Sequence, residues 1–182
     1  MALSKPNPRN HLHTRDIQCK GYQREDGLWD IEAEIIDTKT YSFDNVDRDG
    51  VAAGDPVHHM WVRLTLDDEM VVHKAEASTD ASPYSICGDI VSSLEALEGL
   101  AILPGWRRGV IKCLGGTKGC THITDLLCGP VAVTAHQTIF AAKERRKSAK
   151  PGKKPPQINT CHAYAQNSDI VRRQWPDFYE EA

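Results

Sequence analysis

An alternation of apolar and polar residues over positions 28–38 constrains the fold of this 182-residue chain more than any other feature. The apolar residues in this row are Trp29, Ile31, Ala33 and Ile35, and the acidic residues between them are Asp30, Glu32 and Glu34. A period of two is typical of a half-buried strand. We therefore expect the apolar row to face a core and the acidic row to meet water.

The stretch before this strand predicts its first partner. Residues 17–24 are also strand-like, and Asp26-Gly27 is a frequent sequence in two-residue hairpin turns. With those two residues in the turn, Arg24 lies opposite Trp29, and Tyr22 follows on the same face. The Arg24 side chain would then stack on the indole ring or project past it into a pocket.

A second hairpin is expected after an Asp-rich loop over 37–55. Residues 56–66 alternate as a third strand and place His58 on its apolar face. Acidic residues at 67–69 make the turn, and 70–78 returns as a fourth strand. The Asp-rich loop lacks the ligand spacing of an EF-hand, so calcium is not expected.

The period lengthens beyond Pro83 from two residues to nearly four, which indicates helices. We expect helices over 86–100, 106–114 and 121–143, the last with a kink near Gly129-Pro130. Strands followed by helices favour an α+β fold. The predicted architecture is a four-stranded antiparallel sheet of two hairpins with three or four helices packed on one face.

The chain divides into three parts by composition. Residues 1–142 are expected to form a single domain, with 1–15 as an extended N-terminal arm. Residues 143–157 are rich in Lys and Arg and read as a flexible basic linker. Residues 158–182 regain apolar and aromatic side chains, and we expect this segment to pack back on the domain.

Overall charge and composition exclude several classes of function. A net charge of -3 offers no electrostatic footprint for nucleic acid or a membrane surface. The start of the chain does not resemble a signal peptide, and no apolar run approaches the roughly 20 residues that span a bilayer. The six cysteines form no CxxC pair, which favours free thiols and a cytoplasmic location. An uncovered strand edge would allow a homodimer.

The best candidate site brings together residues at the ends of separate elements. Cys120 and His122 begin the long helix, His58 enters the third strand, and Cys87 begins the first helix. Cys120, His122 and His58 would serve as catalytic groups, with a cysteine–histidine pair for proton transfer or nucleophilic attack. Alternatively, His58, Cys87 and Cys120 suit a single zinc or iron ion with one open position. Buried structural thiols and ordinary core histidines would give the same pattern.

A nucleotide cofactor is not expected. The glycine-rich stretch at 115–119 lacks the residue order of a phosphate-binding P-loop.

Several motifs, in order along nearly the whole chain, resemble an uncharacterised bacterial family known only as a domain of unknown function. They are His13-Thr14-Arg15, Arg24-Glu25-Asp26-Gly27-Leu28-Trp29-Asp30, Pro56-Val57-His58, Gly119-Cys120-Thr121-His122 and Cys161-His162. The resemblance implies a bacterial cytoplasmic protein involved in the catabolism of aromatic or steroid-like compounds. It implies no particular mechanism.

A second likeness is to the iron–sulfur scaffold fold, the IscU-like class. Residues 60–78 look like the central hairpin of that family, and His58, Cys87 and Cys120 fall near its ligand positions. That family binds iron–sulfur clusters or zinc there. This chain differs by placing His where the family has Cys or Asp, and by its added terminal segments.

These patterns favour a small-molecule enzyme, a lyase or hydrolase acting on an aromatic or otherwise apolar organic acid. Aromatic side chains would stack on the substrate, and cationic ones would bind its carboxylate. The expected substrate-binding residues are Arg24, Trp29, Tyr22, Arg15 and His13. The alternatives are a metal or iron–sulfur carrier without catalysis, and a partner-binding module that uses the basic linker.

Overall fold

The computed structural model describes residues 3–146 and 154–181. The chain forms two compact units, residues 1–143 and 144–182, and each is described by itself. Residues 147–153 of the predicted linker over 143–157 lie outside the described residues, and the positions of the two units relative to each other are not determined. How the C-terminal segment packs therefore stays a prediction.

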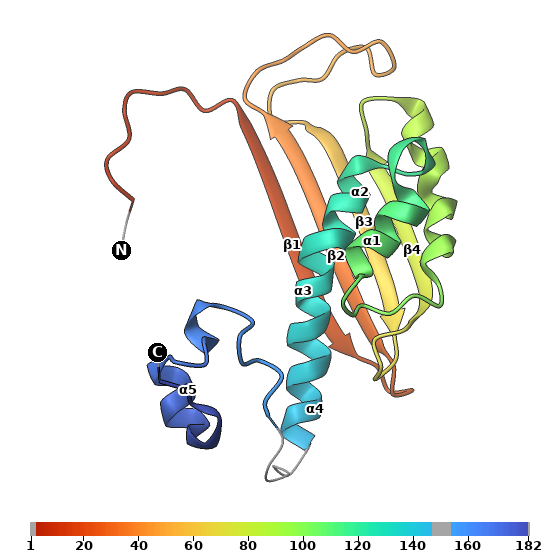
Figure 1. The fold of residues 1–182 in the computed structure, drawn as a ribbon. Coiled ribbons are helices and arrows are strands. Elements are labelled where there is room, and N and C mark those ends of the chain that lie inside the picture. The colour runs from red at the N-terminus through yellow and green to blue at the C-terminus, as the bar shows by residue number, and fades with distance from the viewer. Residues whose placement is uncertain (1–2, 147–153, 182) are drawn as a thin grey trace. The chain divides into compact units, whose positions relative to one another are not determined.

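The first unit contains one four-stranded sheet (Figure 1). Its strands are β1 (His13–Gln23), β2 (Trp29–Lys39), β3 (Pro56–Leu66) and β4 (Val72–Ala81). They pair antiparallel in the order β1-β2-β3-β4, as two consecutive hairpins predict. Strand β1 begins at His13, so the predicted arm over 1–15 is too long by three residues.

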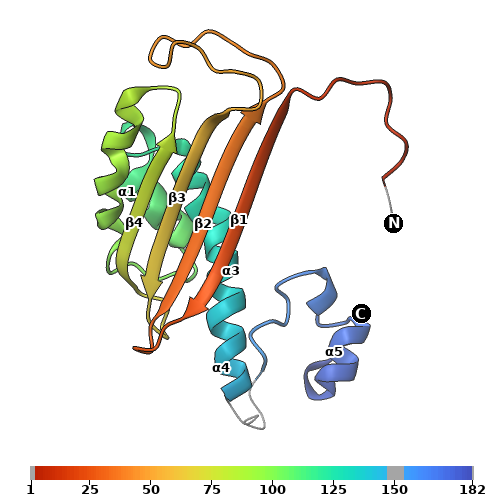
Figure 2. The same cartoon turned by 180° about the vertical axis from the view of Figure 1, so that it is seen from behind.

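The helices cover a single face of this sheet, and Figure 2 shows the opposite face without them. They are η1 (Ser85–Leu97), α1 (Trp106–Leu114), the short turn η2 (Gly116–Lys118), and a long helical run from Thr121. That run comprises α2 (Thr121–Leu126), η3 (Leu127–Val131), α3 (Ala132–Ala135), η4 (His136–Phe140) and α4 (Ala141–Arg146). The wider turns of η3 surround Pro130, near the predicted kink. The α+β prediction is confirmed.

The core lies between the sheet and the helices. Trp29, Ile31, Ala33 and Ile35 on β2 are all buried, as the alternation predicts. Helical side chains that close over them include Leu97, Trp106, Val110, Ile123, Leu127 and Val131. The Trp106 indole N–H donates to the Leu127 carbonyl at 2.8 Å and so ties α1 to the long helical run that carries His122.

The first hairpin differs from the prediction by one residue. The Arg24 N–H donates to the Leu28 carbonyl at 2.8 Å, so the loop has three residues and Gln23, not Arg24, pairs with Trp29. In this loop only Gly27 takes a positive φ, +87°, whereas a two-residue type I′ turn needs two such residues. The shift moves Tyr22 and Arg24 to the outer face of the sheet.

The described residues of the second unit form three short helical segments beyond residue 154. They are η5 (His162–Tyr164), α5 (Asp169–Gln174) and η6 (Pro176–Phe178). Ser168 caps α5 by accepting the Val171 N–H at 3.2 Å, and the rings of Tyr164 and Trp175 lie 5.8 Å apart. Across the described parts of both units, no helix has the length and apolar character needed to cross a bilayer.

Candidate functional site

The candidate site is built around Asp37, near the end of β2. Asp37 continues the alternation of Trp29, Ile31, Ala33 and Ile35, so its side chain points to the core face of the sheet and is only 3% exposed. A buried carboxylate is costly unless cationic or N–H groups surround it. Four side chains from three other elements supply those groups.

Strand β1 provides the first two partners. Arg15 stands opposite Asp37 in the strand pairing and binds both carboxylate oxygens, with Nε 2.7 Å from Oδ1 and Nη2 2.8 Å from Oδ2. His13 lies on the same face, and its Nε2 is 3.1 Å from Oδ1. A two-pronged Arg–carboxylate contact is strong and directional. Arg15 and His13, predicted to bind substrate, therefore both contact Asp37.

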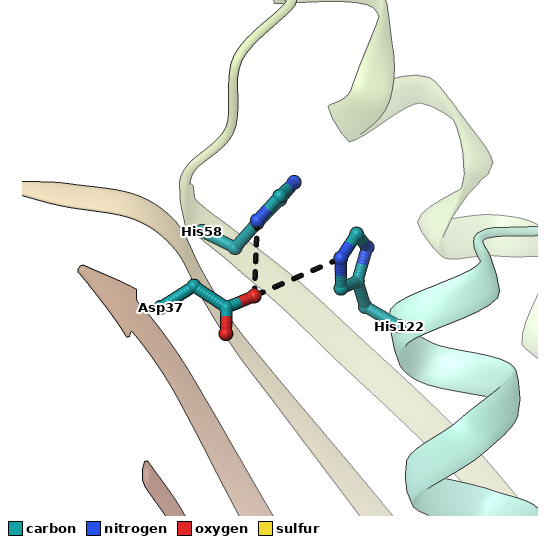
Figure 3. Close-up of side chains that lie close together, drawn as sticks. All are labelled: Asp37, His58 and His122. Carbon is teal, nitrogen blue, oxygen red and sulfur yellow. Dashed lines mark hydrogen bonds and ion pairs between the residues drawn. The ribbon is translucent and has the colours of Figure 1, made fainter. Parts of the chain in front are cut away.

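Two histidines complete the cluster from the opposite side (Figure 3). His58 on β3 pairs with Asp37 across the sheet and places its Nδ1 3.1 Å from Oδ2. His122, in the first turn of α2, places its Nε2 3.7 Å from the same oxygen. The two imidazole rings lie 3.8 Å apart at an angle of 34°. The predicted inward placement of His58 is confirmed.

Cys120 extends this chain of contacts by one residue. It is the residue before α2, and its Sγ lies 3.7 Å from His122 Nδ1 and 3.8 Å from Met60 Sδ. Cys120, His122 and Asp37 thus form a line of polar groups. The order is that of a nucleophile, a base and an orienting acid, at distances longer than in an assembled triad.

The charges in the cluster favour an ionised carboxylate beside neutral imidazoles. Burial raises the pKa of Asp37, but hydrogen bonds and positive charge from Arg15 outweigh it and hold that pKa below its usual value. Burial, together with the neighbouring His122, lowers the pKa of His58 despite the attraction of Asp37. Burial and the Arg15 charge likewise lower the pKa of His122.

A cavity of about 590 Å³ opens beside the two histidines. His58, His122 and Cys120 line one side, while Pro83, Tyr84, Ile86 and Ile90 form an apolar wall with Met60. Cys87, Asp89, Thr117, Gly119 and Thr121 complete the lining. No Lys or Arg appears among these described lining residues. The space therefore suits an apolar molecule that meets its polar partners at the histidine side.

Three of the predicted substrate-binding residues lie elsewhere. Trp29 is 2% exposed in the core, and its indole N–H donates to Asp68 at 2.9 Å. Arg24 contacts Asp26 and Asp30 on the outer face, with Tyr22 beside it. Trp29 is eight residues from Asp37 along β2, which separates them by roughly 26 Å. The structure places these three residues away from the cavity.

The predicted metal set comes together only in part. Cys120 and Cys87 both line the cavity with His58, but it is Asp37 and His122 whose ligand atoms lie within 4.8 Å of the His58 nitrogen. The sequence motifs did not predict Asp37 as a residue of this site. The signal was present, since an acidic residue occupied the next core-facing position of an apolar strand.

Comparison with known proteins gives a family without a known activity. A family described as "protein of unknown function" (DUF2889) matches residues 13–137. The chain belongs to the DUF2889 family. No curated protein and no solved structure matches it, so the likeness to iron–sulfur scaffolds stays a prediction.

The DUF2889 match has boundaries that fit the site. It begins at His13 and includes Asp37, His58, Cys120 and His122. It leaves out the residues before β1 and the whole second unit. The cluster and its cavity therefore lie within the part of the chain that matches the family.

Proposed function

We propose that this DUF2889 protein is a small-molecule enzyme, a lyase or hydrolase, that acts on a compound with an aromatic or apolar body. One observation carries the proposal: His58 and His122, which both contact Asp37, line a cavity whose other lining residues are mostly apolar. Groups that move protons are thereby held beside an apolar surface that opens to solvent at Tyr84 and Ile86.

Each polar group has a role that its contacts favour. Asp37 accepts the Nδ1–H of His58, which leaves Nε2 as the proton acceptor. In Figure 3 that second nitrogen points away from Asp37. In a hydrolysis His58 would take a proton from water, and in an elimination it would take one from carbon. Cys120, beside His122, would act as a nucleophile or proton donor.

The lining also limits how an organic acid would bind. Arg15 already contacts both oxygens of Asp37 and is not free to bind a substrate carboxylate. We therefore propose that the apolar body enters the cavity and that a carboxylate stays at its solvent-facing opening. Free cysteines, six in number among the described residues, suit a reducing compartment such as the cytoplasm.

A paired substrate panel tests this proposal. Purified protein would be given 4-nitrophenyl phenylacetate and 4-nitrophenyl acetate, and an aromatic and an aliphatic β-hydroxy ketone for elimination. We expect turnover in one class, with the aromatic member favoured by about 10-fold or more, since burying a phenyl ring contributes on the order of 2 kcal/mol. Ile90→Gln should reduce that preference. The absence of turnover in both classes would contradict the proposal.

A metal or iron–sulfur carrier is the second candidate. It is favoured by the two cysteines, Cys87 and Cys120, that line the same cavity as His58. A carrier would bind metal and pass it to an acceptor protein without turning over any substrate in the panel. Turnover of a panel substrate by the metal-free protein would show that the protein is not solely a metal carrier.

A further inference from the structure

We propose that Asp37, His58 and His122 bind one divalent first-row transition metal ion, such as Zn²⁺, with a coordination position open to the cavity. This inference deepens the proposed function and rests on it for its catalytic meaning. Binding itself is measurable without any substrate.

The separations between the three ligand atoms carry the proposal. Oδ2 of Asp37 lies 3.1 Å from Nδ1 of His58 and 3.7 Å from Nε2 of His122, and all three atoms lie within 4.8 Å of one another. Atoms that share an ion at about 2.0–2.1 Å stand about 3.0–3.4 Å apart. The distance from Oδ2 to His58 Nδ1 already lies in this range, and a turn of the His122 ring that brings its Nε2 closer to both atoms would complete the geometry.

The donor atoms select the class of metal. Two imidazole nitrogens and one carboxylate oxygen suit Zn²⁺, Fe²⁺ or Co²⁺, whereas Ca²⁺ and Mg²⁺ prefer oxygen ligands. Three protein ligands leave at least one position for water or substrate, as in catalytic rather than structural sites. His58 and His122 both line the cavity, so that position faces the space where a substrate would lie.

Asp37 has a lone pair left for the ion. A carboxylate offers about four acceptor positions. On Oδ1 two are taken by Arg15 Nε and His13 Nε2, and on Oδ2 one is taken by Arg15 Nη2. The remaining position on Oδ2 is the one that faces His58 and His122. The ion would replace the proton that Asp37 and His58 share. His58 would then carry its proton on Nε2 and could act as a proton donor, so the base role of Nε2 described above belongs to the metal-free form.

Residues outside the ligand set hold it in place. Arg15 and His13 fix the Asp37 carboxylate, and Cys120 contacts His122 at Nδ1, the nitrogen that does not face Asp37. Such outer contacts typically change metal affinity by about 10–100-fold. Cys120 is therefore a positioning residue here rather than a ligand, and Cys87 lies outside the set.

Cobalt titration of the full chain, freed of metal with a chelator, tests the proposal. We expect one Co²⁺ per chain, visible d–d absorption, and no thiolate-to-cobalt charge-transfer band. His58→Gln and His122→Gln should each weaken binding by at least about 100-fold, more than loss of an outer contact costs. Cys120→Ser should keep the stoichiometry and the visible spectrum.

Matched controls separate this site from surface binding. His59→Gln changes the neighbouring residue on β3, whose ring contacts Glu34 on the outer face. His11→Gln changes the exposed arm. Both variants should bind Co²⁺ as the wild type does. A charge-transfer band, unchanged binding in His58→Gln and His122→Gln, or no binding at all would each overturn the proposal.

Turnover is scored separately from binding. If Co²⁺ binds as expected and the substrate panel shows no activity, the metal site stands and the enzyme proposal fails. If activity survives removal of all metal and Co²⁺ does not bind, the enzyme proposal stands and the metal site fails.

Discussion

Replacing Arg15 with methionine is expected to lower the free energy of unfolding by about 2 kcal/mol at neutral pH. The Asp37 side chain is 3% exposed and would keep its charge without its main cationic partner. Breaking a fully buried ion pair costs about 3–5 kcal/mol, and the loss expected here is smaller than that range because Arg15 is itself 35% exposed. Urea denaturation of both proteins in the presence of a chelator measures the difference.

The same pair should leave a signature in the pH dependence of stability. The pKa of Asp37 is lower in the folded protein than in the unfolded chain, where about 3.9 is usual. The stabilisation that ionised Asp37 provides is therefore fully present at a pH above its pKa in the unfolded chain, and it is lost as the pH falls through its pKa in the folded protein. The difference between wild type and Arg15→Met should shrink over that acidic range.

Arg24→Met is the matched control for this prediction. Arg24 also contacts two carboxylates, those of Asp26 and Asp30, but it lies on the outer face at the hairpin loop. Exposed pairs of this kind contribute little to stability, so the free energy of unfolding should change far less than in Arg15→Met. Equal stability losses in the two variants would show that Asp37 does not depend on Arg15.

His58→Gln is expected to reduce turnover of the preferred substrate by about 10²–10⁴-fold, the range typical of a lost general acid or base. Glutamine keeps a polar group near Asp37 but cannot accept a proton at neutral pH. KM should change little, because the apolar wall of Ile86 and Ile90 remains. Steady-state kinetics of the purified variant provide both numbers.

His59→Gln provides the control for the kinetics as well. His58 and His59 are adjacent on β3, yet they point to opposite faces of the sheet, toward Asp37 and Glu34 respectively. His59→Gln should retain the wild-type kcat. If it lost as much activity as His58→Gln, the reactive surface would lie on the outer face.

The strands were predictable because period two has a simple physical origin. Alternate residues of a strand face opposite sides, so the apolar row of β2 and the inward placement of His58 follow from spacing alone. The helix over Trp106–Leu114 follows in the same way from its apolar spacing and the glycines that flank it. Strands β2 and β3 carry two residues of the proposed metal site, Asp37 and His58, and α2 carries the third, His122.

The hairpin loop was not predictable from its turn residues. Asp26-Gly27 occurs in two-residue loops and also in three-residue loops that end in a left-handed glycine. The difference of one residue reverses which side chains of β1 face the core. That is why Tyr22 and Arg24 lie outside, while His13 and Arg15 reach Asp37.

Asp37 itself illustrates a different difficulty. Its position on the core-facing row was visible, but a carboxylate at the end of a strand is equally typical of the loop that follows. Only the pairing of β1, β2 and β3 shows that Arg15, Asp37 and His58 stand side by side. The approach of His122 depends on how the long helix packs, which no local pattern encodes.

The most direct test is a histidine NMR titration with a non-reacting aromatic ligand of the substrate class found in the panel. The chain has eight histidines, and His58 and His122 face the cavity while His59 and His73 contact Glu34 and Asp67. We expect the ring signals of His58 and His122 to shift, and those of His59 and His73 to stay unchanged. Shifts confined to His59 or His73 would contradict the assignment of the functional site to the Asp37 cluster.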